Sequence, residues 1–161
     1  MRQFALALTA LFVTGTAQAT DVTFTDPNKF IDATFDRPRS EKNLREVQDA
    51  VSKMFSQLAD KYLAAGQSLR VEVRDIDLAG RIEPTMSMAN DIRVMRTSSW
   101  PRLQFAYTVT QNGAVVRSGE ADIHDFNYLT GFNRYFDSDR LRYERQMLAD
   151  WFRKNLAAKG L

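Results

Sequence analysis

The strongest constraint on the fold is one long amphipathic segment between Ser40 and Ala65. Its apolar side chains recur at three- and four-residue steps: Leu44, Val47, Val51, Phe55, Leu58 and Tyr62. This period predicts an α-helix with one buried face. Ser40 can cap its start, and Gly66 stands where a left-handed residue ends a helix. Because the apolar face must be covered, the rest of the chain is expected to pack against it.

Two short alternating segments flank this helix. Asp21–Phe24 predicts a first strand, and Leu69–Leu78 predicts a second. In the second segment the apolar residues change parity after Arg74, because Asp75 stands where an apolar residue is expected. A one-residue change of phase turns every later side chain to the other face of a sheet. We therefore predict a β-bulge or the end of the strand near Arg74 and Asp75.

The segment Arg102–Ile123 predicts a β-hairpin. A two-residue turn at Asn112–Gly113 would place acidic residues opposite apolar ones in a regular ladder. A three-residue loop over Gln111–Gly113 instead pairs Phe105 with Gly119 and leaves one face mostly apolar. We therefore predict the three-residue loop, with the aromatic ring of Phe105 over the bare backbone of Gly119.

Two further segments complete the predicted fold. Residues 80–101 form a long connection with a short strand at Ile92–Arg96. After the hairpin, Asp137 or Ser138 is expected to cap a last helix, whose buried side is Leu141, Leu148, Trp151, Phe152 and Leu156. The order β-α-β-β-β-α predicts an α+β fold, a four-stranded mixed sheet with two helices packed on one face. A right-handed crossover makes the first two strands parallel.

The first nineteen residues are typical of a secretory signal peptide. Arg2 supplies the positive start, and Phe4–Val13 is an apolar run too short to cross a bilayer. Ala17–Ala19 has the small-x-small pattern of a cleavage site. We predict a signal peptide over residues 1–19 and one exported α+β domain over residues 20–161. A retained membrane anchor is the alternative, and no later segment is long and apolar enough to span a membrane.

Composition excludes several classes of function. The chain has no cysteine, which rules out disulfides, thiolate metal sites and cysteine catalysis. His124 is the single histidine, so sites with several histidine ligands are excluded, and we predict no metal and no cofactor. The glycines are dispersed and form no phosphate-binding loop. The net charge is only +2 and arginines alternate with acids, so we expect no nucleic-acid partner.

Several short motifs occur together in the chain: Asp75–Gly80, Trp100–Leu103, Asp125–Leu129, Leu141–Leu148 and Trp151–Phe152. Their combination resembles a family of small exported proteins of Gram-negative bacteria that is catalogued only as a domain of unknown function. The resemblance implies a single domain in the cell envelope, and together with the signal peptide it predicts a periplasmic location. It implies no activity, so no residue inherits a role from it.

One group of residues has the chemistry of a small hydrolase. Asp75 and Asp77 share one side of a predicted strand, and His124 stands between Asp122 and Asp125. Paired carboxylates and a neighbouring histidine can act as general acids and bases. The candidate catalytic residues are therefore Asp75, Asp77, His124 and Asp125, provided that the strand ends near Asp77 and Asp125 meet. A solvated strand end with local ion pairs is the alternative interpretation.

A second group has the composition of a protein interface. Arg142 and Tyr143 are expected to lie away from the apolar side of the last helix, and both residue types are enriched at interfaces. Trp100 and Arg102, at the end of the 80–101 connection, are further candidate binding residues. We expect exposed sheet edges and this connection to provide the contact surfaces.

The leading hypothesis is a non-catalytic binding module of the cell envelope. Its expected partner is an envelope protein, with an anionic envelope molecule as the second choice. The periplasmic hydrolase is the alternative function. Self-association is a third possibility, and the sequence leaves the oligomeric state open.

Overall fold

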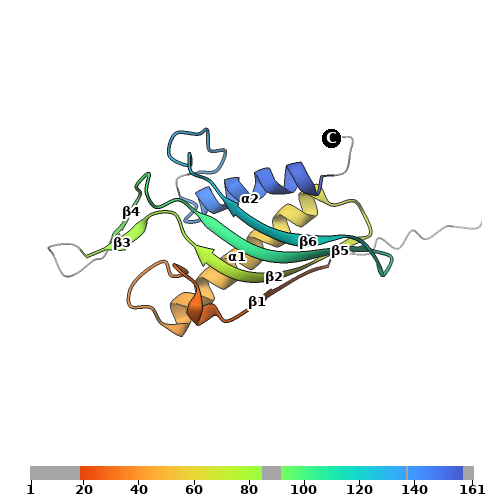
Figure 1. The fold of residues 1–161 in the computed structure, drawn as a ribbon, viewed down its shortest axis with the longest axis horizontal. Coiled ribbons are helices and arrows are strands. Elements are labelled where there is room, and N and C mark those ends of the chain that lie inside the picture. The colour runs from red at the N-terminus through yellow and green to blue at the C-terminus, as the bar shows by residue number, and fades with distance from the viewer. Residues whose placement is uncertain (1–18, 85–91, 137, 158–161) are drawn as a thin grey trace, which may run out of the picture.

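The computed structural model describes residues 19–84, 92–136 and 138–157. One four-stranded sheet has the order β1-β2-β5-β6. Its strands are β1 (Thr20–Phe24), β2 (Gln67–Asp77), β5 (Arg102–Gln111) and β6 (Ala114–His124). The helices α1 (Glu41–Tyr62) and α2 (Arg142–Asn155) cover one face of this sheet, as Figure 1 shows. The α+β class, the mixed sheet and the order of elements are as predicted. The predicted signal peptide lies outside the described residues, apart from Ala19.

The first strand crosses over to the second through α1. β1 and β2 are parallel, with Val22 opposite Val71, as predicted for this connection. β2 and β5 are antiparallel, as are β5 and β6. The main core lies between the sheet and the helices, where Phe55 of α1 meets Phe105 of β5 edge to face and Phe152 of α2 at 6.1 Å between ring centroids.

Helix α1 starts as predicted and ends early. The Ser40 side chain accepts a hydrogen bond from the Asn43 N–H, and the predicted apolar residues are buried. The helix ends at Tyr62 because Leu63 is extended. Gly66 is left-handed, but it lies in a β-turn in which the Gln67 N–H donates to the Ala64 carbonyl. The predicted role of Gly66 as the helix stop was therefore wrong.

Of the two predicted alternatives for β2, the bulge is confirmed, because the strand continues to Asp77. Val73 lies opposite Phe105, whereas Asp75 lies opposite Gln104, so Arg74 is the extra residue. After the bulge, Ile76 turns into the core and Asp75 and Asp77 turn to the outer face of the sheet.

The predicted hairpin loop was wrong. Gln111 pairs with Ala114 across a two-residue turn, in which Asn112 and Gly113 have φ values of 52° and 82°. These angles suit the turn that Asn-Gly favours, whose twist matches the twist of the strands. The register then shifts between Thr110 and Val109 on β5, which marks a bulge on the opposing strand β6.

The bulge on β6 decides which residues face each other farther along the hairpin. Phe105 lies opposite Ala121, and Tyr107 lies opposite Gly119. A Cβ atom at Gly119 would stand 3.2 Å from the Tyr107 ring, so Tyr107 shields this glycine in place of Phe105. The extra residue on β6 returns apolar side chains such as Ile123 to the core side, as the predicted three-residue loop would also have done.

A small ribbon projects from the end of β2. Its strands β3 (Arg81–Glu83) and β4 (Ile92–Val94) are antiparallel, so the predicted short strand at Ile92–Arg96 is confirmed but ends two residues earlier, at Val94. Gly80, with φ 76°, connects β2 to this ribbon. A Cβ atom there would stand only 2.6 Å from the Val94 carbonyl oxygen, so the ribbon can fold back this closely only over a glycine. Residues 85–91 of the predicted connection lie outside the described residues.

Helix α2 begins later than predicted. Its N-cap position is Leu141, which makes no side-chain cap, so Ser138 does not cap the helix. A turn precedes the helix, in which the Asp139 carboxylate accepts the Leu141 N–H at 2.9 Å. Asp137, the other predicted cap, lies outside the described residues. The predicted apolar side is confirmed, since Leu141, Leu148, Phe152 and Leu156 are buried and Trp151 is half-buried.

Candidate functional site

The residues predicted to be catalytic lie at the end of the sheet where β2 and β6 finish. Asp77, Arg102 and His124 are opposite one another on β2, β5 and β6. They therefore form one row on the outer face of the sheet. Arg102 stands between the other two, so the Asp77 and His124 backbones are two strand spacings apart, about 10 Å.

The two aspartates of β2 each have a local partner. Asp75 accepts the Ile31 N–H at 3.0 Å. Asp77 is largely buried, and the Arg81 guanidinium approaches its two carboxylate oxygens at 2.9 and 3.1 Å. Burial raises the pKa of Asp77, and Arg81 offsets part of that rise. Both carboxylates therefore anchor neighbouring segments to the end of β2.

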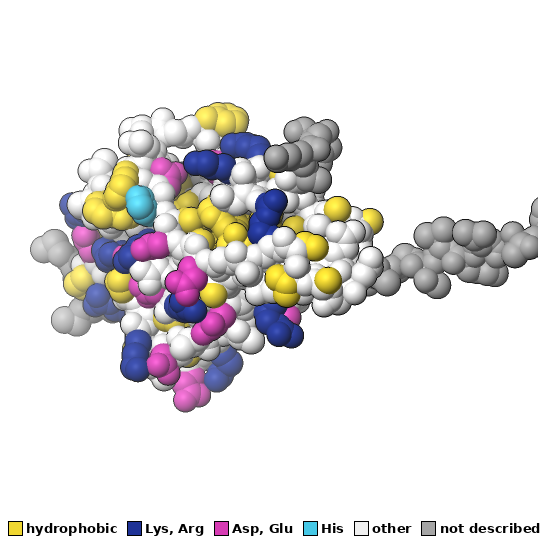
Figure 2. Space-filling view, turned by 45° about the vertical axis from the view of Figure 1, so that its right-hand side comes forward, with side chains coloured by type: hydrophobic (Ala, Val, Ile, Leu, Met, Phe, Trp, Pro, Cys, Tyr) yellow, Lys and Arg dark blue, Asp and Glu magenta, His cyan; other side chains and the backbone are white. Residues whose placement is uncertain are grey.

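His124 and Asp125 also have separate surroundings. The His124 ring lies 4.2 Å from the Phe126 ring, and Figure 2 shows the histidine beside apolar surface. The Asp125 carboxylate turns back to accept the Asn127 N–H at 2.9 Å, which is a local turn contact. The structure thus places His124 in the row of Asp77 and gives Asp125 a role in the chain turn that follows β6.

Arg102, a predicted binding residue, is held by an ion pair across the hairpin. Its guanidinium donates to both Asp122 oxygens, at 2.7 and 2.6 Å, and Gln104 donates to one of them. The Arg102 hydrogen bonds hold the pKa of Asp122 below its ordinary value. A paired guanidinium of this kind is less available to an anionic ligand than a free one.

The expected exposure of Tyr143 was wrong. Only 8% of Tyr143 is accessible, because it packs against Ala79 and meets the Tyr128 ring edge to face at 4.7 Å. Trp100 is half-buried beside this cluster. Arg142 stacks over the Tyr143 ring and donates to its hydroxyl group. Residues that follow β2 and β6 thus cover the start of α2, which the helical period alone does not reveal.

Sequence reasoning missed a half-buried ionic network behind the ribbon. Arg93 of β4 donates to both Asp32 oxygens, at 2.9 and 3.1 Å, and to the Thr34 carbonyl at 2.6 Å. Asp32 in turn bridges to the end of β2 at Asp77. Bidentate arginine pairs of this kind are strong and directional. The network fastens the ribbon and the 30–34 segment to the end of the sheet.

Sequence reasoning also missed Glu144, a buried carboxyl group on α2. It is 2% exposed, and one of its oxygens accepts the Ala79 N–H at 2.7 Å. Its other oxygen has no hydrogen-bond partner among the described residues. Burial raises the pKa of Glu144 to about 7, although the Ala79 N–H and the charge of Arg93 oppose the rise. Its position three residues after Leu141 is the sequence signal that places it on the buried face.

β6 is one of the two edges of the sheet, β1 being the other, and no described strand pairs with its outer side. The Asp125 N–H donates to the carbonyl of Pro101, the residue before β5. Hydrogen-bonded and non-hydrogen-bonded pairs alternate along an antiparallel ladder. The residues before Asp125 therefore point their N–H and C=O groups alternately toward β5 and away from it. The residues that point their N–H and C=O groups away from β5 are Ser118, Glu120, Asp122 and His124.

An open groove runs between this edge and α2. Its volume is about 500 Å³. Ala121 and Ile123 of β6 and Met147 and Trp151 of α2 contribute apolar surface, while Asp150 and Lys154 add charge. Figure 1 shows β6 and α2 side by side along this boundary. The groove and the free backbone groups of β6 form one continuous surface, called the β6 edge below.

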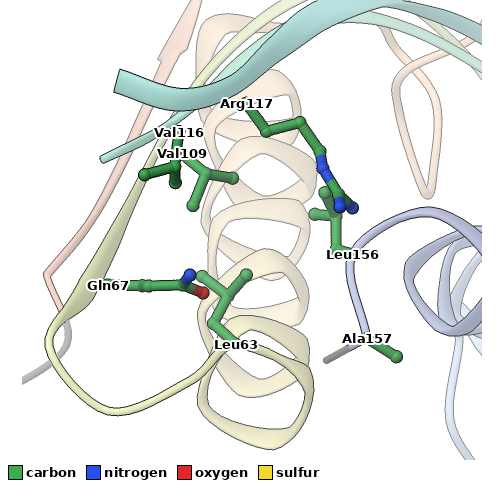
Figure 3. Close-up of a pocket in the computed structure, with 7 residues that line it drawn as sticks. All are labelled: Leu63, Gln67, Val109, Val116, Arg117, Leu156 and Ala157. Carbon is green, nitrogen blue, oxygen red and sulfur yellow. The ribbon is translucent and has the colours of Figure 1, made fainter. Parts of the chain in front are cut away.

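A smaller hollow of about 180 Å³ lies at the hairpin end of the sheet, away from Asp77. Figure 3 shows the Arg117 side chain reaching toward Leu156 across this hollow. The remaining lining residues are Leu63, Gln67, Val109, Val116 and Ala157. Arg117 is the one titratable group in this lining, so the hollow lacks a pair of groups for acid–base chemistry.

Among the described residues, no three side chains of histidine, cysteine, aspartate or glutamate gather in a way that could hold a metal ion. Neither of the described helices has the length and apolar character needed to cross a membrane.

The model of the family DUF3016, proteins of unknown function, matches residues 18–154. The chain belongs to this family. The match runs from just before β1 to the last turn of α2, so the whole sheet of the DUF3016 chain lies within it. The resemblance to a family catalogued only as a domain of unknown function is thereby confirmed.

The DUF3016 chain also resembles a solved structure. A protein from Xanthomonas campestris, assigned to the family DUF330, aligns with a TM-score of 0.36 and 10% sequence identity. The alignment covers 89% of this chain and 83% of that one. No curated protein matches the DUF3016 chain.

Proposed function

We propose that this protein is an exported, periplasmic binding module that takes up an extended segment of an envelope protein along the β6 edge. The observation that carries the proposal is the row of outward backbone groups at Ser118, Glu120, Asp122 and His124. An added strand pairs with such groups through main-chain hydrogen bonds, which give affinity without a defined sequence.

The groove beside β6 supplies the side-chain selectivity of this proposal. Successive side chains of an added strand point to opposite faces, so every second one would enter the groove. Its apolar surface comes from residues such as Ile123, Met147 and Trp151. The preferred ligand is therefore an extended segment with apolar residues at alternate positions. Lys154 and Asp150 add charges of both signs, which fits a polar peptide backbone better than a uniformly charged polymer.

The hydrolase hypothesis gains no support from this geometry. Asp75 and Asp77 are engaged with the Ile31 N–H and with Arg81, and Arg102 separates Asp77 from His124. A hydrolytic site needs a nucleophile or an activated water between its acid and its base. The binding hypothesis requires only surfaces that the described chain exposes.

A proline at Glu120 tests the proposed strand addition. Proline is tolerated at an edge position whose N–H faces solvent, and it removes the outward donor that an added strand would use. Glu120→Ala is the matched control, because both variants lose the Arg74–Glu120 ion pair but alanine keeps the N–H. For peptides selected from a random library on the wild-type protein, we expect Glu120→Pro to weaken binding about tenfold or more. Glu120→Ala is expected to bind almost normally.

Amide hydrogen exchange provides the second measurement. In the free protein, the outward N–H groups of Ser118, Glu120 and Asp122 should exchange quickly. A bound peptide strand should protect these three while leaving β1 unchanged, since β1 is the other edge. Failure to select any peptide, or equal binding by the proline and alanine variants, would contradict the proposal.

A further inference from the structure

The loop that follows β6 exposes an unusual amount of hydrocarbon. In this aromatic loop, residues 125–136, Phe132 and Phe136 are 86% and 85% exposed. Phe126 and Leu129 are also exposed. Phenylalanine is normally among the buried residue types, and clustered exposure of apolar side chains marks a contact surface. Figure 2 shows hydrophobic side chains at the top of the molecule, which is where the aromatic loop lies in Figure 1.

The tyrosines of the same loop point inward. Tyr128 is buried, donates its hydroxyl hydrogen to the Arg96 carbonyl at 2.8 Å, and packs on Tyr143. Tyr135 packs against the main core. Water alone would favour the opposite arrangement, with the polar-tipped tyrosines outside and the phenylalanines inside. The outer side of the loop therefore suits an apolar medium.

The loop conformation is held by its own hydrogen bonds. The Asn127 carbonyl accepts the N–H groups of Thr130 and Gly131, and the Asn133 side chain accepts the Tyr135 N–H. The Arg134 N–H donates to the Gln146 side chain of α2. The phenylalanines thus project from a defined backbone that is tied to α2.

The low charge of the aromatic loop limits the kinds of partner that it can contact. From Phe126 to Phe136 the one charged residue is Arg134, and its side chain pairs with Asp150. The segment Phe126–Phe136 therefore carries no carboxylate that anionic headgroups would repel, and the nearest ones in the sequence are Asp125 and Asp137 at its two ends. Phenylalanine and leucine side chains on an otherwise uncharged projection are typical of segments that enter the boundary between headgroups and acyl chains.

We propose that the aromatic loop docks this protein on a lipid bilayer surface, with Phe132 and Phe136 inserted among the lipids. A convex projection needs no matching pocket when its partner is fluid, and predicted export brings the chain next to the envelope membranes. The contact is peripheral, since the loop is short and the rest of the domain folds around its own core. The proposed lipid contact does not depend on strand addition at the β6 edge, because strand addition involves backbone groups of the preceding strand.

Vesicle flotation tests the proposal. The mature protein is mixed with vesicles of phosphatidylethanolamine and phosphatidylglycerol, and with vesicles of phosphatidylcholine alone. We expect the protein to float with both, and the double variant Phe132→Ser/Phe136→Ser to lose about tenfold or more in partitioning. Brominated lipids give a second readout, because Trp100 meets Phe126 at 4.8 Å and should be quenched on insertion.

Two further variants distinguish insertion of the aromatic loop from nonspecific hydrophobic adsorption to vesicles. Phe132→Leu/Phe136→Leu keeps the apolar surface and should restore flotation. Val115→Ser/Val116→Ser removes exposed apolar side chains at the hairpin tip and should leave flotation unchanged. Thermal unfolding of each variant verifies the fold.

Three outcomes would overturn the proposal. They are absence of wild-type flotation, flotation that survives the double serine change, and an equal loss in the valine control. If the serine change instead dissociates an oligomer, the loop is a contact between copies of the chain. Glu120→Pro should float normally, so failure of the lipid contact and failure of strand addition are distinguishable.

Discussion

Glu144 is the residue whose chemistry is changed most by its place in the fold. It is fully enclosed where α2 packs on the loop after β2, and one oxygen accepts the Ala79 N–H. Its charged form loses the hydration that an exposed carboxylate keeps, which is why its pKa rises to about 7. Asp139 adds a further negative charge nearby, while Arg93 acts in the opposite direction.

This raised pKa predicts a stability that depends on pH. Between pH 4.5 and 7 the folded protein holds a proton on Glu144 that the unfolded chain releases, so the free energy of unfolding falls as the pH rises. The contribution of Glu144 to the free energy of unfolding is fully present below pH 4.5 and is lost by about pH 7. The free energy of unfolding changes by about 3 kcal/mol over this range. Urea unfolding at pH 5 and pH 7.5 measures it.

The neutral variant Glu144→Gln should remove this dependence and be more stable than the wild type at pH 7.5. Glu41→Gln is the control, because the Glu41 side chain is exposed at the start of α1. A pH dependence that Glu144→Gln shares with the wild type would show that other groups cause it.

At the scale of elements, the β3–β4 ribbon depends on a close approach that few sequences allow. Gly80 is left-handed and lies directly against the Val94 carbonyl. Arg93 then ties the ribbon to Asp32 and Thr34 in the segment before α1. A glycine and an arginine thus decide where this element packs, although neither contributes to the apolar core.

Two glycine substitutions separate backbone strain from steric conflict. Gly113 is also left-handed, but a Cβ atom there would meet nothing within 4 Å. We expect Gly113→Ala to lower the free energy of unfolding by about 1–2 kcal/mol, through the left-handed conformation alone. Gly80→Ala carries the same strain and also forces the ribbon away, so we expect a loss of about 3 kcal/mol or more. Equal losses in urea denaturation would show that the ribbon adapts at no cost.

At the scale of the whole molecule, the two contact surfaces proposed here adjoin each other. The β6 edge ends at His124, and the aromatic loop starts with the next residue. The helices cover one face of the sheet and the other face is polar, whereas the β6 edge and the aromatic loop present backbone groups and apolar side chains to solvent. A domain of this shape can hold an extended segment close to a bilayer.

Export is the prediction at this scale. The mature chain is expected to begin at Thr20, the first residue of β1, and to contain 142 residues, 20–161. Mass spectrometry of the protein isolated from the periplasmic fraction measures this directly. Ala19→Asp, which spoils the cleavage pattern, should leave the uncleaved precursor. A full-length mass for the wild-type protein, or its recovery from the cytoplasm, would contradict the prediction.

The elements and the core were predictable because they depend on local period. The spacing from Leu44 to Tyr62 determined α1 and its buried face, and the parity change at Arg74 indicated a bulge or a strand end at the position where the bulge occurs. The existence of the hairpin was predictable from the sequence, but its register was not. Its register depends on a bulge in β6, because two different loops leave the same residues on the apolar side.

The candidate site was less predictable, because its contacts join residues far apart in the chain. Asp32 and Arg93 are 61 positions apart, and Ala79 and Glu144 are 65 apart. No local pattern indicates that Tyr143 is covered by Tyr128, or that Arg102 separates Asp77 from His124. The sequence by itself determined the class of fold, the apolar faces and the chemistry that is excluded. Tertiary structure alone decided which charges are paired, which carboxyl group is buried and which groove lies beside the β6 edge, since these depend on the distance between elements in space.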